Sequence, residues 1–570
     1  MKKLITAGAA GACLLMQPAL AARPPAHSQW ATVVNNNDTM PPLEARNFNS
    51  YNQPSVNLDG LVVIRARSRG GPPLGPPTHG IYTRDMAKRG SPIVRILDRT
   101  TAVPQPNNLG STFVETPSFP RIDMATATIA TRGNHPPAWE YGETRAGTTG
   151  IYANPFGDLI TGASKLGAVA EFSFFEVPEY PGTLFEVFPG APAVTGGDTV
   201  VFKGNYTTAA GDGRTGVYYR QLQDQPIGDD DLSPAGGSAP VVLIANSSST
   251  LIPGTTTVFG STSPPSAANG RVVFAGFDNE ENPTLGGLYL APLEPMPDLV
   301  TLVSIGGQVP GESAGERFNG LGEGGAFDGR FVGFWGAWGD QTKIVRLYCS
   351  TEGNKDRIDY CNQALVCEGA GEPIGDPDSI CDDESDPRYG QSCYQDRRVP
   401  VHQGIFVHDS RTGQTRAVAR TGAGFDEFLY WNYSGKTPCT GGGHGEEGAE
   451  DDGEPARWRS SAFVAVSGRG AAVWTAFKAS RGGTGAAGNA AVDGIYLAKS
   501  PGNAPLVTLV DTTQPGRTLD PEAPAASVVT AVGIERDGFR GRWLVINAAM
   551  EAEGGEEDSG MAGIYITRLP

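Results

Sequence analysis

One short phrase recurs seven times in this chain of 570 residues and constrains its architecture. Each copy contains a strand of small residues, a tight turn, a β-branched or aromatic run, and later a Gly followed by an aliphatic and an aromatic residue. The turns fall at Gly60, Asp123, Gly197, Gly270, Gly329, Gly470 and Gly538, and the later strands begin at Gly80, Gly150, Gly216, Gly287, Gly404, Gly494 and Gly563. Strand repeats of this length indicate similar units stacked in line or around an axis.

A fourth, apolar strand follows in several copies, for example at residues 241–244 and 506–510. Four antiparallel strands per unit are typical of a propeller blade, and the small first strand suits the crowded axis. We therefore predict an all-β, seven-bladed β-propeller. The turns at Gly329 and Gly470 lie 141 residues apart, which leaves an eighth blade as an alternative. Because residues 350–403 lack the repeated phrase, we interpret this stretch as an insertion.

The two ends of the chain complement each other. The seventh copy ends after its third strand, at residues 563–567, and lacks a fourth. Residues 30–34, Trp-Ala-Thr-Val-Val, form an apolar run with no blade of their own. We expect this N-terminal strand to join the C-terminal blade, which closes the ring and removes open strand edges.

The repeats resemble those of two groups of proteins. Asn57-Leu58-Asp59-Gly60 followed by Val63-Ile64 is similar to the Asn-x-x-Gly-x-x-Ala-Phe repeats of bacterial exported tandem-repeat proteins, and more distantly to TolB-type propeller repeats. Asp123 departs most from the pattern, because Gly is usual there. The resemblance implies a propeller over most of the chain. Its motifs are structural and carry no catalytic residues to transfer.

The N-terminus has the pattern of a secretory signal peptide over residues 1–21. Lys2 and Lys3 precede an apolar stretch at 4–16, and Ala19-Leu20-Ala21 suits cleavage. We expect a single mature domain over 22–570, exported to the periplasm or the extracellular space. Lipidation at Cys13 is an alternative. No later stretch is long and apolar enough to span a bilayer. The net charge of −18 argues against nucleic acid as a partner.

Six cysteines remain beyond the predicted cleavage site: Cys349, Cys361, Cys367, Cys381, Cys393 and Cys439. An even number in an exported chain predicts three disulfides, whose pairing stays open. Most lie in a Cys-rich, acidic insertion at about 349–403, whereas Cys439 lies in a long loop at 421–461. A disulfide between the insertion and this loop is one hypothesis. Zinc is disfavoured because no Cys-x-x-Cys pair is present.

Aromatic residues gather in the same two segments. Exposed aromatic faces stack on sugar rings or on apolar partners, so we predict a ligand-binding surface there. The candidate residues are Trp335, Trp338, Tyr430, Trp431, Tyr433 and Trp458. The alternative is that these rings pack the two loops against each other.

Acidic clusters and possible catalytic motifs indicate less about function than the aromatic residues do. Acidic clusters at 229–231, 382–386 and 446–452 contain oxygen ligands suited to calcium, but none has the spacing of a known calcium loop, so we expect no cofactor. Gly311-Glu312-Ser313-Ala314-Gly315 matches a nucleophile elbow, which requires a strand before the Ser and a helix after it. Neither is predicted there. The six histidines are scattered.

Together these patterns favour a non-enzymatic, exported propeller that acts as a binding or scaffold protein. Its ligand would be a glycan or an envelope or extracellular protein, held on the face that carries the long loops. One alternative is a propeller hydrolase or lyase acting on an extracellular polymer, with acid and base from different blades around the axis. A structural envelope protein is another. The fold alone does not choose among them.

Overall fold

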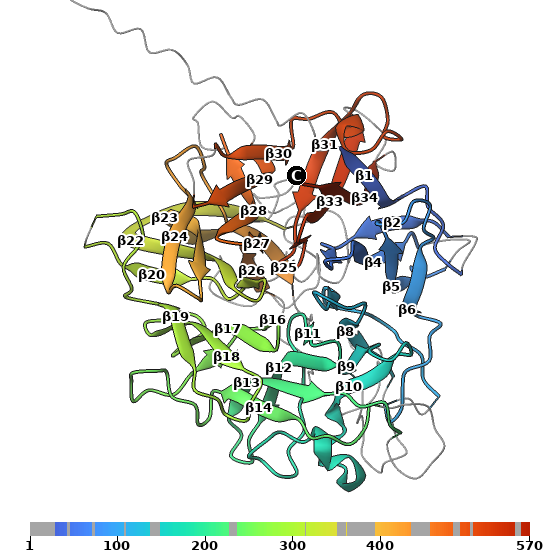
Figure 1. Ribbon diagram of the computed structural model, residues 1–570, viewed down its shortest axis with the longest axis vertical. Helices are drawn as coiled ribbons and strands as arrows, with labels where there is room; N and C mark the ends of the chain where they lie inside the picture. The colour runs from blue at the N-terminus through green and yellow to red at the C-terminus, as the bar shows by residue number, and fades with distance from the viewer. Residues whose placement is uncertain are drawn as a thin grey trace, which may run out of the picture.

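The computed structural model describes residues 29–42, 46–70, 75–107, 110–136, 149–226, 236–313, 315–349, 361, 394–434, 457–482, 491–501, 505–552 and 560–569. Seven antiparallel sheets of four or five strands are arranged around a central axis (Figure 1). The protein is a seven-bladed β-propeller, as the repeats predict. The interval between Gly329 and Gly470 contributes the outer strands of blade 5 and holds no additional four-stranded sheet among its described residues.

The first four blades follow one another along the chain. Blade 1 contains β2 (Phe48–Tyr51), β3 (Ser55–Val56), β4 (Leu61–Ser68), β5 (His79–Asp85) and β6 (Val94–Asp98). Blade 2 contains β7 (Arg121–Ile122), β8 (Ile129–Asn134), β9 (Thr149–Ala153) and β10 (Ile160–Ser164). Blade 3 contains β11 (Ala193–Thr195), β12 (Thr199–Thr207), β13 (Gly213–Gln221) and β14 (Val242–Asn246). Blade 4 contains β15 (Ser261–Thr262), β16 (Ser266–Ala268), β17 (Arg271–Phe277), β18 (Gly286–Pro292) and β19 (Val300–Ser304).

The remaining blades complete the ring. Blade 5 contains β20 (Phe318–Leu321), β21 (Ala326–Phe327), β22 (Phe331–Tyr348), β23 (Tyr394–Asp409) and β24 (Gln414–Arg420). Blade 6 contains β27 (Val464–Arg469), β28 (Ala472–Arg481), β29 (Val492–Ser500) and β30 (Val507–Asp511). Blade 7 contains β31 (Ser527–Gly533), β32 (Phe539–Arg540), β33 (Trp543–Ala552), β34 (Met561–Arg568) and, from the N-terminus, β1 (Trp30–Asn35). A separate ribbon pairs β25 (Tyr430–Ser434) with β26 (Arg457–Ser461), and short 3-10 helices lie at Lys165–Ala168, Ala170–Phe175 and Gly516–Thr518.

The ring closes through β1, as predicted. This strand pairs antiparallel with β34, from Trp30 opposite Thr567 to Asn35 opposite Gly563, and forms the outermost strand of blade 7. In addition to this backbone pairing, the Asn35 Nδ2 donates to Asp520 Oδ2 at 2.9 Å. Asp520 lies in the segment between blades 6 and 7. The two ends of the described chain therefore share one sheet.

Hydrogen bonds from polar side chains join the tight turns of neighbouring blades. The Asp123 Oδ1 accepts the backbone N–H groups of Ala125 and Thr126, both at 2.8 Å, and its Oδ2 accepts that of Gly197 in blade 3 at 3.2 Å. Similar links join Asn57 to Thr126, Thr195 to Gly270, Arg271 to Gly329, Asp328 to Gly468, and Ser467 to Gly541. Asn and Asp recur beside these turns because their side chains cap the turn backbone.

The predicted position of the last turn is wrong by three residues. Gly538 donates to the carbonyl of Glu535 at 2.9 Å and so belongs to a bend that precedes the short β32. The turn between β32 and β33 falls at Gly541, which has a φ of 57°. This is the left-handed region that glycine adopts most easily.

In five of the Gly-aliphatic-aromatic phrases, those at Gly80, Gly150, Gly216, Gly494 and Gly563, the Gly makes room for the Tyr ring two residues later. Side chains two apart lie on the same side of a strand, and the Tyr folds back over the Gly. A Cβ added at Gly216 would lie 2.6 Å from Tyr218 Cζ, and one added at Gly80 would lie 2.6 Å from the Tyr82 hydroxyl. The repeated Gly is therefore a packing requirement of the third strand.

A Phe from the preceding crossing meets the same ring edge-on in six blades. In blade 2 the Phe113 and Tyr152 centroids lie 4.9 Å apart with ring planes at 89°. The equivalent pairs are Phe48–Tyr82, Phe185–Tyr218, Phe259–Tyr289, Phe318–Phe406 and Phe425–Tyr496. In blade 7 the Tyr565 hydroxyl instead donates to Asp520 Oδ2 at 3.1 Å. In these six blades the Phe thus packs the incoming chain against the third strand of the blade.

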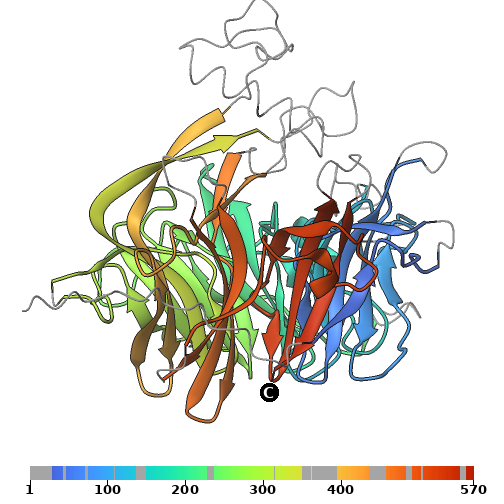
Figure 2. The same cartoon turned by 90° about the horizontal axis from the view of Figure 1, so that it is seen from above.

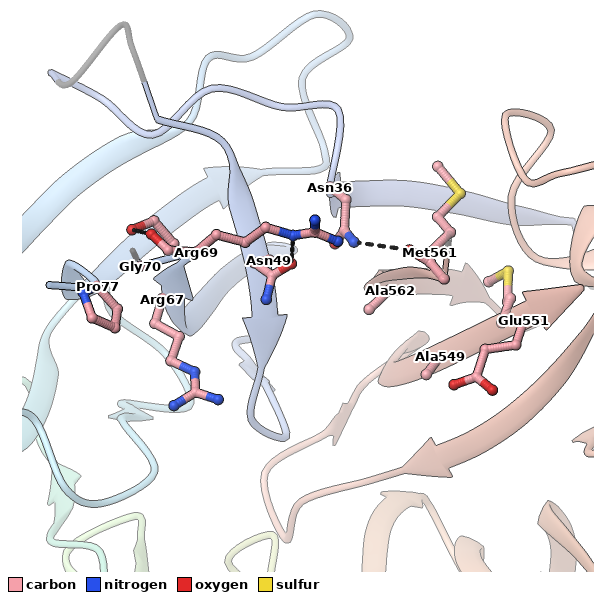
Figure 3. Close-up of a pocket in the computed structure, with 13 residues that line it drawn as sticks. Asn36, Asn49, Arg67, Arg69, Gly70, Pro77, Ala549, Glu551, Met561 and Ala562 are labelled. Atoms are coloured by element: carbon pink, nitrogen blue, oxygen red, sulfur yellow. Dashed lines mark hydrogen bonds between the residues drawn. The ribbon is translucent and has the colours of Figure 1, made fainter. Parts of the chain in front are cut away.

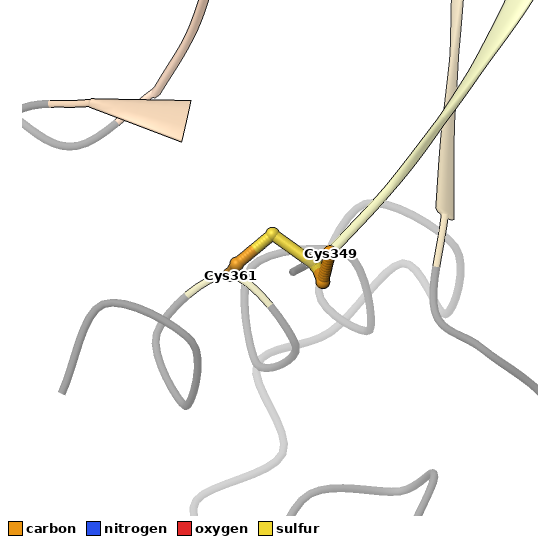
Figure 4. The surroundings of a disulfide bond; sticks show 2 residues. All are labelled: Cys349 and Cys361. Carbon is orange, nitrogen blue, oxygen red and sulfur yellow. A yellow bond between two sulfur atoms is a disulfide. The ribbon is translucent and has the colours of Figure 1, made fainter. Parts of the chain in front are cut away.

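Blade 5 departs from the others because β22 and β23 continue beyond the sheet as a ribbon, visible at the top of Figure 2. Their pairing extends from Thr342 opposite Pro400 to Tyr348 opposite Tyr394. Residues 394–403, expected within the insertion, therefore belong to a strand. A disulfide joins Cys349, just after β22, to Cys361 (Figure 4). The other four cysteines, and with them the disulfide expected between insertion and loop, lie outside the described residues.

No helix in the described ranges has the length and apolar character needed to cross a membrane.

Adding one methyl group under a repeated Tyr should destabilise the protein. We expect Gly216→Ala to lower the free energy of unfolding by about 1–3 kcal/mol, because the new Cβ overlaps the Tyr218 ring. Gly213→Ala is the matched control, since a Cβ at Gly213 in the same strand meets nothing within 4 Å. Chemical denaturation of both variants measures the difference. Equal stability of the two variants would rule out this packing role.

Candidate functional site

The two faces of the propeller differ. Tight turns occupy one face, while the longer loops between second and third strands, the crossings between blades and the blade 5 ribbon occupy the other (Figure 2). We call the second the loop face. Because loops held by a rigid scaffold tend to carry function, the candidate surfaces are on this face.

The β25–β26 ribbon projects toward the middle of the ring in Figure 1. One end is attached to blade 6, where the Tyr430 hydroxyl shares a hydrogen bond of 2.9 Å with Ser480 Oγ. At the other end, the Arg457 Nη2 lies 2.9 Å from Glu280 Oε1 in the loop that joins β17 to β18 of blade 4. The ribbon therefore reaches from blade 6 to blade 4.

Three predicted ligand-binding residues share one side of this ribbon. Trp431 and Tyr433 are two residues apart on β25, and Trp458 on β26 is paired with Tyr433. The Tyr433 and Trp458 centroids lie 5.4 Å apart with ring planes at 70°. All three side chains are half-buried. We call Trp431, Tyr433 and Trp458 the aromatic side of the ribbon.

Two polar groups on the aromatic side are unsatisfied. The indole Nε1 atoms of Trp431 and Trp458 are shielded from solvent and have no hydrogen-bond acceptor among the described residues. A shielded donor without an acceptor is costly, and in native proteins a bound water or ligand often satisfies it. The aromatic side thus combines ring faces with two donors that lack a partner.

Tyr430 differs from the other aromatic residues of the ribbon. Its ring lies beneath the Lys478 Nζ, 3.6 Å from the centroid, and burial raises the pKa of its hydroxyl. It faces blade 6, away from the aromatic side, because neighbouring residues of a strand point in opposite directions. Tyr430 therefore anchors the ribbon.

Trp335 and Trp338 lie within blade 5. They are 8% and 4% exposed, respectively. The Trp335 Nε1 donates to Gln403 Oε1 at 3.0 Å, and the Trp338 ring stacks on His402 with centroids 6.1 Å apart. The six predicted residues thus fall into two sets, of which the ribbon holds four.

Charged side chains fill the axis near the tight turns. Arg121 of blade 2 donates to Glu535 Oε1 at 3.0 Å, to Asp537 of blade 7, and to Ser266 Oγ of blade 4 at 3.3 Å. Arg540 also donates to Asp537. Arg121, Glu535, Asp537 and Arg540 are at most 4% exposed. We call these four residues the axial cluster.

The axial cluster favours the charged form of Asp537. Burial alone would raise the pKa of Asp537, but Arg121 and Arg540 together hold that pKa below its usual value. A hydrolase or lyase with its acid and base around the axis would need carboxylates that can change protonation near neutral pH. Glu535 and Asp537 are instead committed to arginines.

The other candidates are dispersed. His135 Nδ1 lies 2.8 Å from the carbonyl of Pro136, and His408 Nδ1 lies 2.9 Å from Thr415 Oγ1. Ser313 lies in the crossing between β19 and β20, not at a strand-to-helix turn. The three acidic clusters lie outside the described residues, and the described residues contain no group of three His, Cys, Asp or Glu arranged to hold a metal.

The sequence reasoning did not identify a cavity on the loop face where blade 7 meets blade 1. Its volume is about 620 Å³ (Figure 3). Arg67, Arg69 and Asn49 line the blade 1 wall, and Glu551 and Met561 line the blade 7 wall. Figure 3 shows the Arg69 side chain extending across the cavity toward Asn36. The alternating arginines of β4 were a visible signal, but strand pairing was needed to place blade 7 beside them.

Comparisons with known proteins give similarity of fold only. The sequence matches no family model and no curated protein. Among solved structures, a Trypanosoma rangeli sialidase aligns with 10% identity and a TM-score of 0.34 over 84% of this chain and 60% of the sialidase chain. A Penicillium chrysogenum α-L-arabinanase aligns with 13% identity and a TM-score of 0.23, over 51% and 71% of the two chains. A family 117 glycoside hydrolase of Zobellia galactanivorans aligns with 11% identity and a TM-score of 0.24, over 58% and 87%. Likeness at this level does not extend to activity or ligand.

Breaking the axial cluster should destabilise the protein strongly. We expect Arg121→Met to cost about 3–5 kcal/mol of unfolding free energy, because it leaves Glu535 and Asp537 buried with fewer partners. Lys88→Met, which removes an exposed partner of Asp85, should change stability little. Denaturant titrations at neutral pH test this. A loss for Arg121→Met no larger than that for the control would contradict the structural role of the cluster.

The difference in stability between wild type and Arg121→Met should depend on pH. Because the folded-state pKa of Asp537 is depressed, its contribution to stability is present above its unfolded pKa of about 4 and is lost as pH falls toward the folded value. A protonated Asp537 no longer requires Arg121. The stability gap between wild type and Arg121→Met should therefore narrow as pH falls below about 4. A gap that stays constant from neutral to acid pH would argue against this linkage.

Proposed function

We propose that this protein is an exported propeller that binds a carbohydrate through the aromatic side of the β25–β26 ribbon, with a binding rather than a catalytic role. The observation that carries the proposal is the grouping of Trp431, Tyr433 and Trp458 on one side of the ribbon, with two indole donors that lack acceptors among the described residues. Sugar rings present apolar C–H faces and hydroxyl acceptors, which suit stacking rings and indole N–H groups together.

The position of the ribbon supports this assignment. It is fixed at both ends, by Tyr430 on blade 6 and by the Arg457–Glu280 ion pair on blade 4. A surface held rigidly loses less conformational entropy when it binds a ligand. The aromatic side is thus presented on the loop face by a rigid scaffold.

Export is supported by the disulfide between Cys349 and Cys361. Disulfides persist in oxidising compartments and are rare in the cytosol. The signal-like residues 1–21 lie outside the described residues. The periplasm or the extracellular space is therefore the proposed location, where polysaccharides and envelope proteins are available as ligands.

Removing a ring from the aromatic side should abolish carbohydrate binding. We expect wild type to bind a set of neutral oligosaccharides on a glycan array, and Trp431→Ala or Trp458→Ala to weaken that binding about tenfold or more. Asn432→Ala is the control, because Asn432 is exposed on the opposite side of the same ribbon.

Two outcomes would count against the carbohydrate. No binding by wild type on the array, together with specific capture of an envelope protein that Trp431→Ala abolishes, would indicate a protein ligand at the same surface. Equal binding by wild type, Trp431→Ala and Trp458→Ala would remove the ribbon from the interaction.

A further inference from the structure

Charge is distributed unevenly over this acidic protein. Residues 46–99, which span blade 1, contain nine lysines and arginines against three aspartates, a net charge of +6 within a chain of net charge −18. A basic blade on an acidic scaffold creates a local positive potential that attracts anions. The sequence pattern alone does not say which face of blade 1 carries it.

The arginines of β4 place much of this charge on the loop face. Arg65 and Arg67 are two residues apart and lie on the same side of the strand, and Arg69 continues this spacing just after it. Successive arginines are therefore about 7 Å apart along the strand direction. Arg67 and Arg69 are exposed. Among the described residues, no carboxylate lies within ion-pair distance of Arg67.

Side chains from the inner edge of the blade orient each of these arginines. The Arg67 Nε donates to Ser50 Oγ at 2.7 Å, and the Arg69 Nε donates to Asn49 Oδ1 at 2.8 Å. The bond from Arg67 uses the Nε of its guanidinium. The terminal Nη groups are the part that forms paired hydrogen bonds with a carboxylate or sulfate.

The neighbouring histidine reports the positive potential. Burial lowers the pKa of His79, and Arg65, Arg67 and Arg99 lower it further against the opposing effect of Glu115. His79 is paired with Arg67 across the strands β4 and β5. The field of the arginines therefore acts on groups at this end of the blade.

The adjoining cavity has the chemistry of a sugar site rather than of a simple ion site. Its about 620 Å³ can hold more than one sugar residue. Asn36, Asn49 and Glu551 offer acceptors and donors for hydroxyl groups, while Pro77 and Met561 provide apolar contact.

We propose that the cavity between blades 7 and 1 is a second ligand site, which binds an anionic polysaccharide carrying carboxylate or sulfate groups through Arg67 and Arg69. The site lies on the same face as the aromatic side of the ribbon but shares no residue with it. The existence of this second site does not depend on the function proposed above.

Binding of charged polymers should depend on the two arginines. The probes are soluble polygalacturonate for the carboxylate, dextran sulfate for the sulfate, and neutral dextran. We expect wild type to bind at least one charged polymer more tightly than dextran, and the double variant Arg67→Ala, Arg69→Ala to bind that charged polymer about tenfold more weakly or worse. The polymer that binds distinguishes carboxylate from sulfate recognition.

A matched control separates the contribution of the site to binding from the effect of overall charge. Lys88→Ala, Arg89→Ala removes the same two charges from the same blade, but on the tight-turn face, and should leave affinity within about twofold. Arg67→Lys, Arg69→Lys keeps the charge but loses the paired geometry, so it should bind more weakly than wild type. This variant also tests the site if the alanine variant fails to fold.

Several results would overturn the inference. These are no binding of either charged polymer, equal loss in the two alanine double variants, or binding of duplex DNA or anionic vesicles in preference to both polymers. Trp431→Ala should leave polygalacturonate and dextran sulfate binding unchanged. Loss of that binding in Trp431→Ala would show that the charged polymer uses the ribbon, which separates failure of this inference from failure of the proposed function.

Discussion

The pairing of β1 with β34 is the interaction on which the rest of the ring depends. Six blades are built from consecutive residues, but blade 7 needs the N-terminal strand to complete its sheet. Without this strand the edge of β34 would present unpaired backbone groups, and the covalent connection from blade 1 to the sheet of blade 7 would be lost. The Asn35–Asp520 hydrogen bond attaches the same strand to the crossing from blade 6. Closure therefore fixes the relative positions of blades 6, 7 and 1.

A closed ring also determines what can lie on the axis. The innermost strands of adjacent blades are in contact all the way round, so only small side chains or well-paired large ones fit between them. At the tight-turn end the space is filled by the axial cluster, whose arginines and carboxylates offset the cost of each other's burial. Those groups pair with one another, whereas both candidate surfaces lie on the loop face.

Much of this fold could be predicted from the sequence because short repeated motifs specify its strands and turns. The turns, the Gly-aliphatic-aromatic strands and the unpaired strand at residues 30–34 each appear in contiguous residues. The turn at Gly541 was missed because the bend at Gly538 has the same composition as a true turn, and only the pairing of Phe539 with Leu544 distinguishes them. The extent of the blade 5 ribbon was missed for a similar reason, since the partner of Tyr348 lies beyond a long insertion.

The candidate site was less predictable, because it depends on residues from different blades. Aromatic content pointed to the loop at 421–461, but only the register of β25 and β26 separates Trp431, Tyr433 and Trp458 from Tyr430. The burial of Trp335 and Trp338 depends on Gln403 and His402, which lie more than sixty residues further along the chain. The cavity between blades 7 and 1 exists only because the ring closes.

The two proposed surfaces lie at different places on the loop face. The ribbon spans blades 6 to 4, whereas the arginine-lined cavity lies between blades 7 and 1, so a polymer that reaches both must extend across the loop face. Because the two surfaces share no residue, each can bind its own ligand without the other. The negative charge of the rest of the protein would then keep an anionic polymer away from every other surface. Closure of the ring, which holds blades 7 and 1 together, is therefore also what would align the polymer.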